Sequence, residues 1–532
     1  MYKRQVYIDI VNRLKDTTYS QAQITSIEEF FTNVLGNRGY AFAEVVGNPE
    51  INEATNEVKL IFSVQPGNRT YTRKILFTGN DITQDYVLRR EMRQFEGAWT
   101  SDNSIEAGKV RLERLGYFKE VNVETIPVPG TEDQIDIVYS VEEETTGSVG
   151  GNIGYSDFGL MLGFNLQEQN FLGSGNTVGI GINKNIYSEM YNISYMNPYA
   201  TRDAVSLGYN VFFRETDYGE FNVANYLTNS NGFGAQFGYP ISDISRLGFN
   251  ITYDKTDIDI GTLPAREIYD FVSVEGNIFE TLTAQLSWQQ VTLNRGLFPT
   301  DGASTVVSFS STIPGSDLSY YRFNIRQRYY QPLSSDFVFG FQGEIGYLDS
   351  YGDTEEIPFF QNFYAGGPRS LRGFESNTLG PRSTDAPCYE FNYEDGTCPN
   401  LLDTDGDGEA DAPYLNPYAN QGQRSRYRDA PIGGNIKVEG SLQLIFRLPF
   451  IEDQRSLRSA FFFDFGNVFS DNCKEYQINC SELSVDELRY SYGVGITWIT
   501  GFGPMSLAIA KPTNAGPLER TEEFQFTVGN VF

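Results

Sequence analysis

The sequence predicts a transmembrane antiparallel β-barrel preceded by smaller α+β units of the order β-α-α-β-β. Three observations point to this fold class: residues 1–144 repeat one pattern of helices and strands, later segments alternate in side-chain polarity, and their connections alternate between short and long. At 532 residues, the chain is too long for one ordinary soluble domain. Aromatic residues make up 14% and charged residues 20%, a balance that favours a large β structure over a cytosolic enzyme.

Charge and motif content exclude several classes of function. The formal net charge is −29, so no basic face is available for a nucleic acid. The chain has no histidine, the usual general base of hydrolysis, and neither a GxxxxGK(S/T) phosphate loop nor a GxSxG elbow. We therefore expect a protein that is not an enzyme and does not bind nucleic acid.

Membrane insertion through a helix is not expected, because no run of about 18 apolar residues occurs. A barrel crosses the membrane with strands, whose apolar residues come at every second position. The N-terminal stretch MYKRQVYIDIVNRL is basic but lacks the apolar segment of a secretory signal. Either the signal has been removed or the chain is a fragment, and the absence of one expected strand from the first unit favours a fragment.

The first α+β unit is expected over residues 1–66. Apolar residues at Ile27, Phe30 and Phe31 follow a helical spacing that ends at Gly36. The stretch VKLIFSVQPG then alternates as a strand does and stops at a Pro-Gly pair.

The second unit, residues 67–146, repeats this plan. The stretch RTYTRKILFTGN predicts a strand, residues 82–100 predict a helix, and residues 104–116 predict a second helix that precedes two more strands. The pairs NRGY–AFAEV and RLGY–FKEV recur at equivalent places, about 75 to 80 residues apart, which indicates an internal repeat.

Residues 147–532 are expected to form the barrel, with no convincing helix after Glu144. In FVFGFQGEIGY, aromatic and aliphatic residues share one parity, and small and polar residues share the other; RLGFNITYDKT alternates in the same way. The connections QPLSSD and YPISDIS are tight, whereas 375–431 and 470–486 are long, which is typical of the two rims of an outer-membrane barrel. A soluble β-sandwich also alternates, but the length of the strand region and its aromatic density favour a barrel.

The final strand, FQFTVGNVF, runs into the C-terminus, and a closed barrel requires it to pair with the first strand, near SVGGNIGYSDFG. Because glycine weakens strand pairing, we expect this seam to be the weakest joint of the barrel wall. The candidate seam residues are Gly150, Gly151, Asn152 and Gly154 on the first strand, and Phe524, Phe526, Val528, Gly529 and Phe532 on the last.

Four cysteines lie in polar, turn-rich segments as two local pairs. Four cysteines allow three pairings, and the short loops favour Cys388–Cys398 and Cys473–Cys480. Such disulfides indicate an oxidising compartment. Metal ligation is the alternative, but a zinc site would lack both a CxxC motif and a histidine.

The stretch DTDGDGEAD places carboxylates at alternate positions, at Asp403, Asp405, Asp407 and Asp411. Alternating carboxylates can surround a hard cation with oxygen ligands, so this loop resembles the start of a calcium-binding EF-hand loop. The glutamate expected at position twelve of such a loop is Tyr414 here. A solvated acidic loop is the alternative reading, and no cofactor is expected to be required.

Several stretches resemble the BamA family, the central subunits of the bacterial outer-membrane β-barrel assembly machinery. The most specific are PFFQNFYAGGPRSLRGFESNTLGP, RGLFPTDG and FQFTVGNVF, together with VLRREMRQFEGAW and GKVRLERLGYF before the barrel. The resemblance implies that residues 1–66 are an incomplete fourth POTRA domain, that residues 67–146 are a fifth, and that residues 147–532 are a sixteen-stranded barrel with a long extracellular loop at 375–431. It places the barrel in the bacterial outer membrane and the POTRA domains in the periplasm.

In this family, an Arg-Gly-Phe loop tip folds back into the barrel and meets acidic groups on the inner wall. The matching residues are Leu371, where the family usually has valine, Arg372, Gly373, Phe374 and, as the inner-wall acid, Asp464. A second family acid is Gln443 here, and Glu439, four residues earlier on the same face, is the candidate substitute. A guanidinium in a restricted lumen needs a carboxylate, and its planar fork suits a two-point grip.

The resemblance implies that the protein assembles β-barrel proteins and inserts them into the outer membrane. The weak seam supplies a mechanism, because an opened strand edge is a template for client strands. The implied partners are unfolded outer-membrane proteins, the lipid bilayer and lipoproteins of the machinery, including BamD at the POTRA region. Alternatives are a TamA-like or two-partner-secretion transporter of the same superfamily, a passive outer-membrane pore, which would lack the βααββ repeats, and a structural adhesin.

Overall fold

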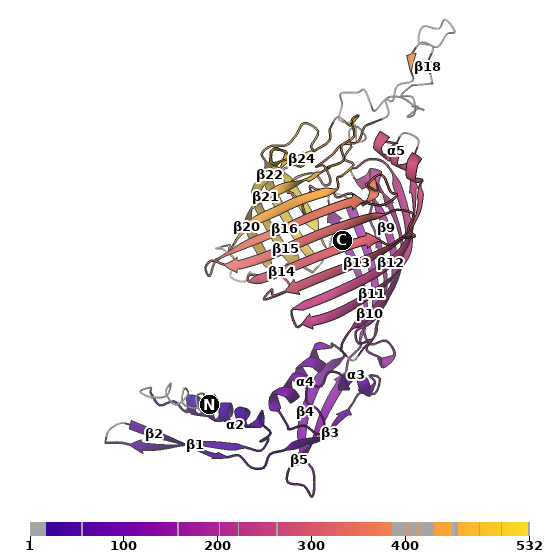
Figure 1. Cartoon of the computed structure of the whole chain (residues 1–532). Coiled ribbons are helices and arrows are strands. Elements are labelled where there is room, and N and C mark those ends of the chain that lie inside the picture. The colour runs from indigo at the N-terminus through magenta and orange to yellow at the C-terminus, as the bar shows by residue number, and fades with distance from the viewer. Residues whose placement is uncertain are drawn as a thin grey trace. The chain divides into compact units, whose positions relative to one another are not determined.

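The computed structural model describes residues 18–529, except for residues 55–56, 157–158, 202, 222, 262–263, 386–400, 403–411, 414–429, 449–450, 452–455, 478 and 502. The chain divides into two compact units, each of which can be followed in Figure 1. The first comprises the residues up to 147 and the turn 169–176, and the second comprises residues 148–168 and the residues from 177 onward.

The N-terminal part of the first unit is a helix followed by a hairpin. Helix α2 (Gln21–Gly36) ends at the glycine that the sequence predicts as its stop. Strands β1 (Glu44–Asn52) and β2 (Glu57–Gln65) pair antiparallel. Ile24 and Phe31 of α2 are buried because they lie two helical turns apart, on one face.

The rest of the first unit has the predicted order β-α-α-β-β. Its elements are β3 (Tyr71–Thr78), α3 (Asp85–Arg89), α4 (Asp102–Arg114), β4 (Phe118–Pro127) and β5 (Gln134–Glu143). The three strands form one sheet in the order β3-β5-β4, in which β5 is parallel to β3 and antiparallel to β4. Ser101 caps α4 by accepting a hydrogen bond from the Ser104 N–H, and Tyr139 of β5 fixes α4 on the sheet by donating to the Ile105 carbonyl.

The long helix predicted over residues 82–100 is wrong, because only α3 is helical there. Beyond it, the buried Gln94 side chain donates to the carbonyls of Phe95 and Trp99 and accepts from the Ser101 N–H. A side chain that hydrogen-bonds the backbone in this way competes with helical hydrogen bonds and stabilises a loop.

The second unit is a closed antiparallel barrel of sixteen strands, as the sequence predicts (Figure 1). In their order around the barrel, the strands are β6 (Gly147–Ser156), β7 (Gly159–Glu168), β8 (Thr177–Lys184), β9 (Ser188–Asn197), β10 (Ser206–Asp217), β11 (Leu227–Ser242), β12 (Ser245–Asp259), β13 (Ile278–Val291), β14 (Gly302–Thr312), β15 (Tyr320–Pro332), β16 (Phe337–Ser350), β20 (Ile436–Phe446), β21 (Leu457–Phe469), β22 (Arg489–Thr500), β23 (Gly503–Pro512) and β25 (Phe524–Val528).

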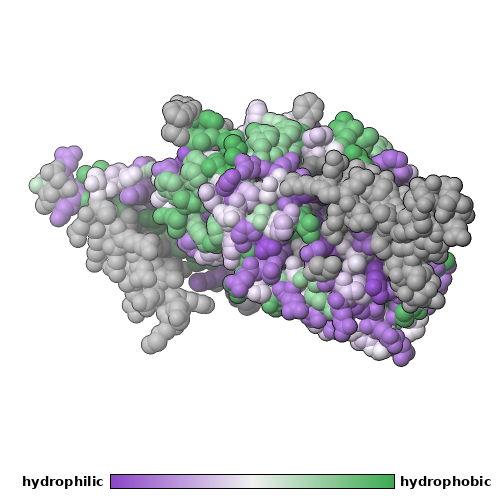
Figure 2. All heavy atoms as spheres, turned by 90° about the horizontal axis from the view of Figure 1, so that it is seen from above, coloured by the Kyte–Doolittle hydropathy of each residue, from purple (hydrophilic) through white to green (hydrophobic). Residues whose placement is uncertain are grey.

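Side chains alternate between the two faces of the barrel wall. In β16, Phe337 and Ile345 are exposed on the outer face, whereas Gly340 and Gly346 of the opposite parity are buried. Figure 2, viewed from above Figure 1, shows hydrophobic residues gathered along stretches of the barrel's outer side and hydrophilic residues across the end that faces the viewer. An apolar outer face is what a barrel needs in hydrocarbon.

The connections between barrel strands alternate in length. Residues 333–336 join β15 to β16, whereas the next connection, from β16 to β20, runs over residues 351–435. Short β-elements lie in or near these loops: β17 (Gly373–Phe374), β18 (Leu401–Leu402), β19 (Ala412–Pro413) and β24 (Thr521–Glu522). Single 3₁₀ turns lie at Phe171–Gly173, Tyr218–Phe221, Phe359–Gln361 and Val485–Glu487.

A helix that the sequence reading missed, α5 (Arg266–Glu275), lies in the loop between β12 and β13. The expectation of no helix after residue 144 is therefore wrong. The signal was present, since Ile268, Phe271 and Val272 follow a helical spacing, but ten residues give it little weight against the strands around it. No helix in the described ranges has both the length and the apolar character needed to cross a bilayer.

Candidate functional site

The tip of the long loop between β16 and β20 is buried inside the barrel. The Leu371 and Phe374 side chains are fully buried, and the Gly367 N–H donates to the carbonyls of both residues, which closes the tip into a tight turn. Gly373 has a φ of +90°, and a Cβ atom at this position would lie 3.1 Å from the Ala510 Cβ of β23. The glycine of Arg-Gly-Phe therefore permits both the left-handed backbone and the close approach to the wall.

Arg372 grips Asp464 of β21 at two points. Its Nε donates to Asp464 Oδ2 and its Nη2 to Oδ1, each at 2.7 Å, and its backbone N–H donates to Oδ2 at 3.2 Å. Asp464 is fully buried, and a buried carboxylate is tolerated only when it is paired and hydrogen-bonded. The two side chains therefore form a planar bidentate pair that ties the loop to the inner wall.

Two further wall residues complete the surroundings of the guanidinium. Arg372 Nη2 donates to Ser441 Oγ of β20 at 3.0 Å, and Ser441 stands opposite Asp464 in the β20–β21 register. The Arg372 Cζ lies 3.4 Å from the centroid of the Phe462 ring, a cation–π contact. The arginine is thus held by an acid, a hydroxyl and an aromatic face.

The prediction that Glu439 substitutes for the second acid of Arg372 is wrong. Glu439 instead accepts a hydrogen bond from Ser370 Oγ at 2.5 Å and forms an ion pair with Lys437 at 3.1 Å. The Gln443 side chain makes no hydrogen bond to Arg372 either, and its Nε2 donates to Ser441 Oγ at 3.2 Å. Lys437 also pairs with Glu344 at 3.3 Å, so Glu439 belongs to a separate ion cluster on the wall.

The loop around the tip packs into a buried apolar cluster with α5. The ring of Phe271 in α5 meets the Phe359 ring edge-on, with centroids 5.3 Å apart, and Leu371 and Phe374 belong to the same cluster. Glu267 of α5 accepts hydrogen bonds from the Thr384 N–H and hydroxyl. Burial raises the pKa of Glu267, although the hydrogen bonds from Thr384 act in the opposite direction.

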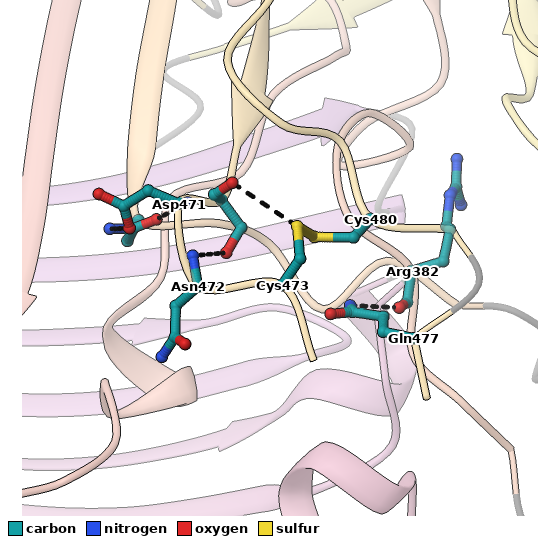
Figure 3. Close-up of a disulfide and its surroundings, with 8 residues drawn as sticks. Arg382, Asp471, Asn472, Cys473, Gln477 and Cys480 are labelled. Atoms are coloured by element: carbon teal, nitrogen blue, oxygen red, sulfur yellow. Dashed lines mark hydrogen bonds between the residues drawn. A yellow bond between two sulfur atoms is a disulfide. The ribbon is translucent and has the colours of Figure 1, made fainter. Parts of the chain in front are cut away.

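A disulfide between Cys473 and Cys480 closes a small ring in the β21–β22 loop (Figure 3). This ring supports the segment that follows the loop tip, since Gln477 Nε2 donates to the Arg382 carbonyl and the Arg382 N–H donates to the Asn479 carbonyl. The disulfide-closed segment therefore lies next to the long loop and hydrogen-bonds its backbone at Arg382.

The seam between β25 and β6 has a single residue pair within the described residues, Val528 with Tyr155. On its other side, β25 pairs with β23 from Phe524 to Val528. Other wall ladders are longer, and the β22–β23 ladder runs from Ser491 to Thr500.

The predicted seam residues lie along this interface, apart from Phe532, which is outside the described residues. Gly150 and Gly151 have open space where a Cβ would stand, whereas Gly154 is buried. Phe524 is 59% exposed on the outer face, and Phe526 and Val528 share its parity. Asn152 Oδ1 is buried and has no hydrogen-bond partner in the part of the chain described here.

Gly529 is the seam residue with the strictest requirement. Its φ is +79°, and a Cβ there would lie 2.5 Å from the Ile153 carbonyl oxygen of β6. Its N–H donates to the Pro504 carbonyl of β23 at 2.8 Å, one step beyond the last β25–β23 pair, Val528 with Met505. Only a glycine fits this backbone without displacing β6.

Several other predicted residues also lie outside the described ranges. They are Cys388, Cys398, Asp403, Asp405, Asp407 and Asp411. Among the described residues, no group of three or more His, Cys, Asp or Glu side chains is placed to hold a metal ion.

Sequence reasoning missed Ser441, Phe462 and Ser370 as partners of the loop. Ser441 could have been predicted, because it lies two residues before Gln443 on the same strand and its polar side chain therefore points to the same face. Phe462 carried no separate signal within the aromatic run FFFDF.

Comparisons with known proteins agree with this geometry. A sequence profile of the Omp85 superfamily domain matches residues 170–532, and the POTRA profile, described as a surface antigen variable number repeat, matches residues 2–67 and 70–144. The outer membrane protein assembly factor BamA of Neisseria meningitidis serogroup B is 30% identical over 543 residues, which cover 97% of this chain and 63% of that protein. The sorting and assembly machinery component 50 homolog of Mus musculus is 24% identical over 438 residues, covering 79% and 81% of the two chains.

A solved structure is also similar. The crystal structure of BamA from Haemophilus ducreyi lacking POTRA domains 1–3 matches with a TM-score of 0.80 and 31% identity, over 96% of this chain and 94% of that one. The chain spans less than two thirds of the length of the Neisseria relative. Because the superfamily profile covers well over half of the residues and the fold is a closed sixteen-stranded barrel, this chain belongs to the Omp85 superfamily.

Proposed function

We propose that this protein assembles β-barrel proteins and inserts them into the bacterial outer membrane. The observation that carries the proposal is the seam, where the first barrel strand, β6, meets the last, β25, through one residue pair among the described residues. The similar proteins named outer membrane protein assembly factor BamA support the same function.

The seam acts by presenting the edge of β6 to a client. When β6 separates from β25, its unpaired N–H and C=O groups pair with an extended client strand, as in other cases of β-augmentation. Further client strands add as hairpins until the new barrel closes on itself and leaves. No bond is made or broken covalently, so we propose that the protein is not an enzyme.

Domain identity and partners follow from the same proposal. We infer that residues 1–66 and 67–146 are the fourth-like and fifth-like POTRA domains, that they lie in the periplasm, and that they bind lipoproteins of the assembly machinery, including BamD. The edges of the β1–β2 hairpin and of the β3-β5-β4 sheet are the strand edges available to extended partners.

Client folding tests the proposed function. Liposomes that contain this chain and its lipoprotein partners are expected to fold a urea-unfolded barrel client at least about tenfold faster than liposomes that contain the lipoproteins alone. The folded fraction is measured by the heat-modifiable gel mobility of the client. Equal folding rates, combined with a large and steady ion conductance, would favour a passive pore instead.

We also propose that calcium binds the loop that contains Asp403, Asp405, Asp407 and Asp411, because alternating carboxylates suit a hard cation. Isothermal titration of the whole chain is expected to show a calcium site that is lost in the variant with Asp405→Asn and Asp407→Asn. Identical heats for the two proteins at millimolar calcium would remove the proposal, and the loop would then be a solvated acidic segment.

A further inference from the structure

We propose that Gln525 is a positioning residue that couples the docked loop tip to the last barrel strand, so that loop docking keeps the seam closed. The inference rests on the proposed function of the seam and deepens it. It assigns a role to a side chain of β25 that points away from the lipid-facing residues Phe524 and Phe526.

The Gln525 amide bridges two backbone groups of the loop tip, the N–H of Gly373 and the carbonyl of Phe374. Its Oε1 accepts from the Gly373 N–H at 3.3 Å, and its Nε2 donates to the Phe374 carbonyl at 2.8 Å. The side chain is 2% exposed, so both hydrogen bonds are shielded from water. An amide is required here, because one group must accept while the other donates.

Backbone pairing reinforces this bridge immediately before β25. Gly373 and Phe374 of β17 pair antiparallel with Glu522 and Thr521 of β24. One step further along, the Glu375 N–H donates to the Arg520 carbonyl at 3.0 Å. The loop tip is therefore an inner strand that runs beside the segment leading into the seam.

The inner contacts matter because β25 lies at the seam, where the last strand of the barrel meets the first. It shares a single described residue pair with β6, while the loop tip holds it from the lumen through Gln525. The same loop tip is tied to β21 through Arg372 and Asp464. The loop thus joins the last strand to β21, three places along the wall on the side away from β6, and in this proposal β6 is the strand that moves when the seam opens.

Two linked states follow from these contacts. Docking of Arg372 favours a fixed β25, and a fixed β25 in turn favours docking, since such coupling is reciprocal. Removing either contact releases the same strand, so removing both adds little beyond removing one.

Disulfide trapping at the seam tests the coupling. Tyr155→Cys and Val528→Cys are introduced at the paired positions, and the rate of disulfide formation is measured in the membrane-inserted chain under a fixed oxidant. Gln525→Leu, which keeps the volume and loses both hydrogen bonds, is expected to slow trapping about tenfold. Gln525→Glu, which keeps the acceptor and loses the donor to Phe374, is expected to slow it as well.

Thr527→Val is the matched control. Thr527 lies on the same strand with the same parity and lines the same 340 Å³ cavity as Gln525, but its hydroxyl makes no hydrogen bond within the described residues. Its trapping rate is expected to match that of the parent. Heat-modifiable mobility verifies that every variant has a folded barrel.

The pattern across variants separates coupling from a general loss of packing. Arg372→Ala is expected to slow disulfide trapping in the two-cysteine protein. In the same protein that already carries Gln525→Leu, Arg372→Ala is expected to slow trapping by less than a further twofold. Unchanged trapping in folded Gln525→Leu, or fully multiplicative effects of the two substitutions, would overturn the proposal. The trapping rate measures how β25 lies against β6 and does not depend on client folding. A failure of the client assay would therefore reject the proposed function without rejecting the coupling between Gln525 and the seam.

Discussion

Oxidation of a chain that carries Tyr155→Cys and Val528→Cys is expected to stop client assembly, and reduction is expected to restore it. These positions face each other in the one described residue pair of the seam. A covalent bond there keeps the edge of β6 paired, and a paired edge offers no N–H or C=O groups to a client strand. The folding rate of an added client should fall to that of liposomes without the chain, measured by heat-modifiable mobility before and after reductant.

The matched control is a cysteine pair at a continuous part of the wall. Ile496→Cys and Leu507→Cys stand opposite each other in the β22–β23 ladder, which is not expected to open. Oxidation of this pair should leave client folding unchanged. If a complete cross-link at the seam leaves assembly unaffected as well, lateral opening is wrong, and the barrel acts by disturbing the membrane or as a scaffold alone.

Replacement of Arg372 by alanine is expected to have the second largest effect. Removing one partner of a buried ion pair leaves the other charge uncompensated and typically costs about 3–5 kcal/mol. Asp464 is fully buried, and its carboxylate would lose the bidentate hydrogen bonds from the guanidinium. Denaturant unfolding of the barrel should show this loss of free energy, and client folding should fall with it because the loop no longer docks.

Arg326→Ala is the control for this measurement. Arg326 also forms an ion pair, with Glu344 at 3.1 Å, but its side chain is 68% exposed. The Glu344 side chain is only 13% exposed, but it keeps Lys437 as a partner at 3.3 Å, so the loss of the exposed arginine leaves no buried charge unpaired and this variant should unfold nearly as the parent does. If Arg372→Ala unfolds like Arg326→Ala, the two-point grip does not stabilise the docked loop. Arg372→Lys separates charge from geometry, since a lysine keeps the charge but not the planar fork.

The barrel and the α+β units could be predicted from the sequence because their signals are periodic over many residues. Alternation in β16 and the repeated NRGY and RLGY stretches needed no knowledge of distant contacts. The docking of Arg372 on Asp464 came from resemblance, because the two lie 92 residues apart and no local pattern joins them.

The failures have local physical causes. The helix expected at 82–100 gave way to a loop held by the Gln94 side chain, and the missed helix α5 is stabilised by a cluster made largely of distant residues. Glu439 has the right face for Arg372 but is paired with Lys437, two residues away on the same strand. A sequence shows which side chains are available, whereas the choice among several charged partners depends on distances that only the folded wall sets.

The contact between the loop tip and the last strand also determines when this protein can reach its final form. Phe374 and Gln525 are 151 residues apart, so their hydrogen bond is a non-local contact. Non-local contacts form late, because a long stretch of chain must first be ordered. A nascent copy that lacks its C-terminal strand therefore lacks the Gln525 bridge to the loop tip, and this bridge forms only once the whole chain is present.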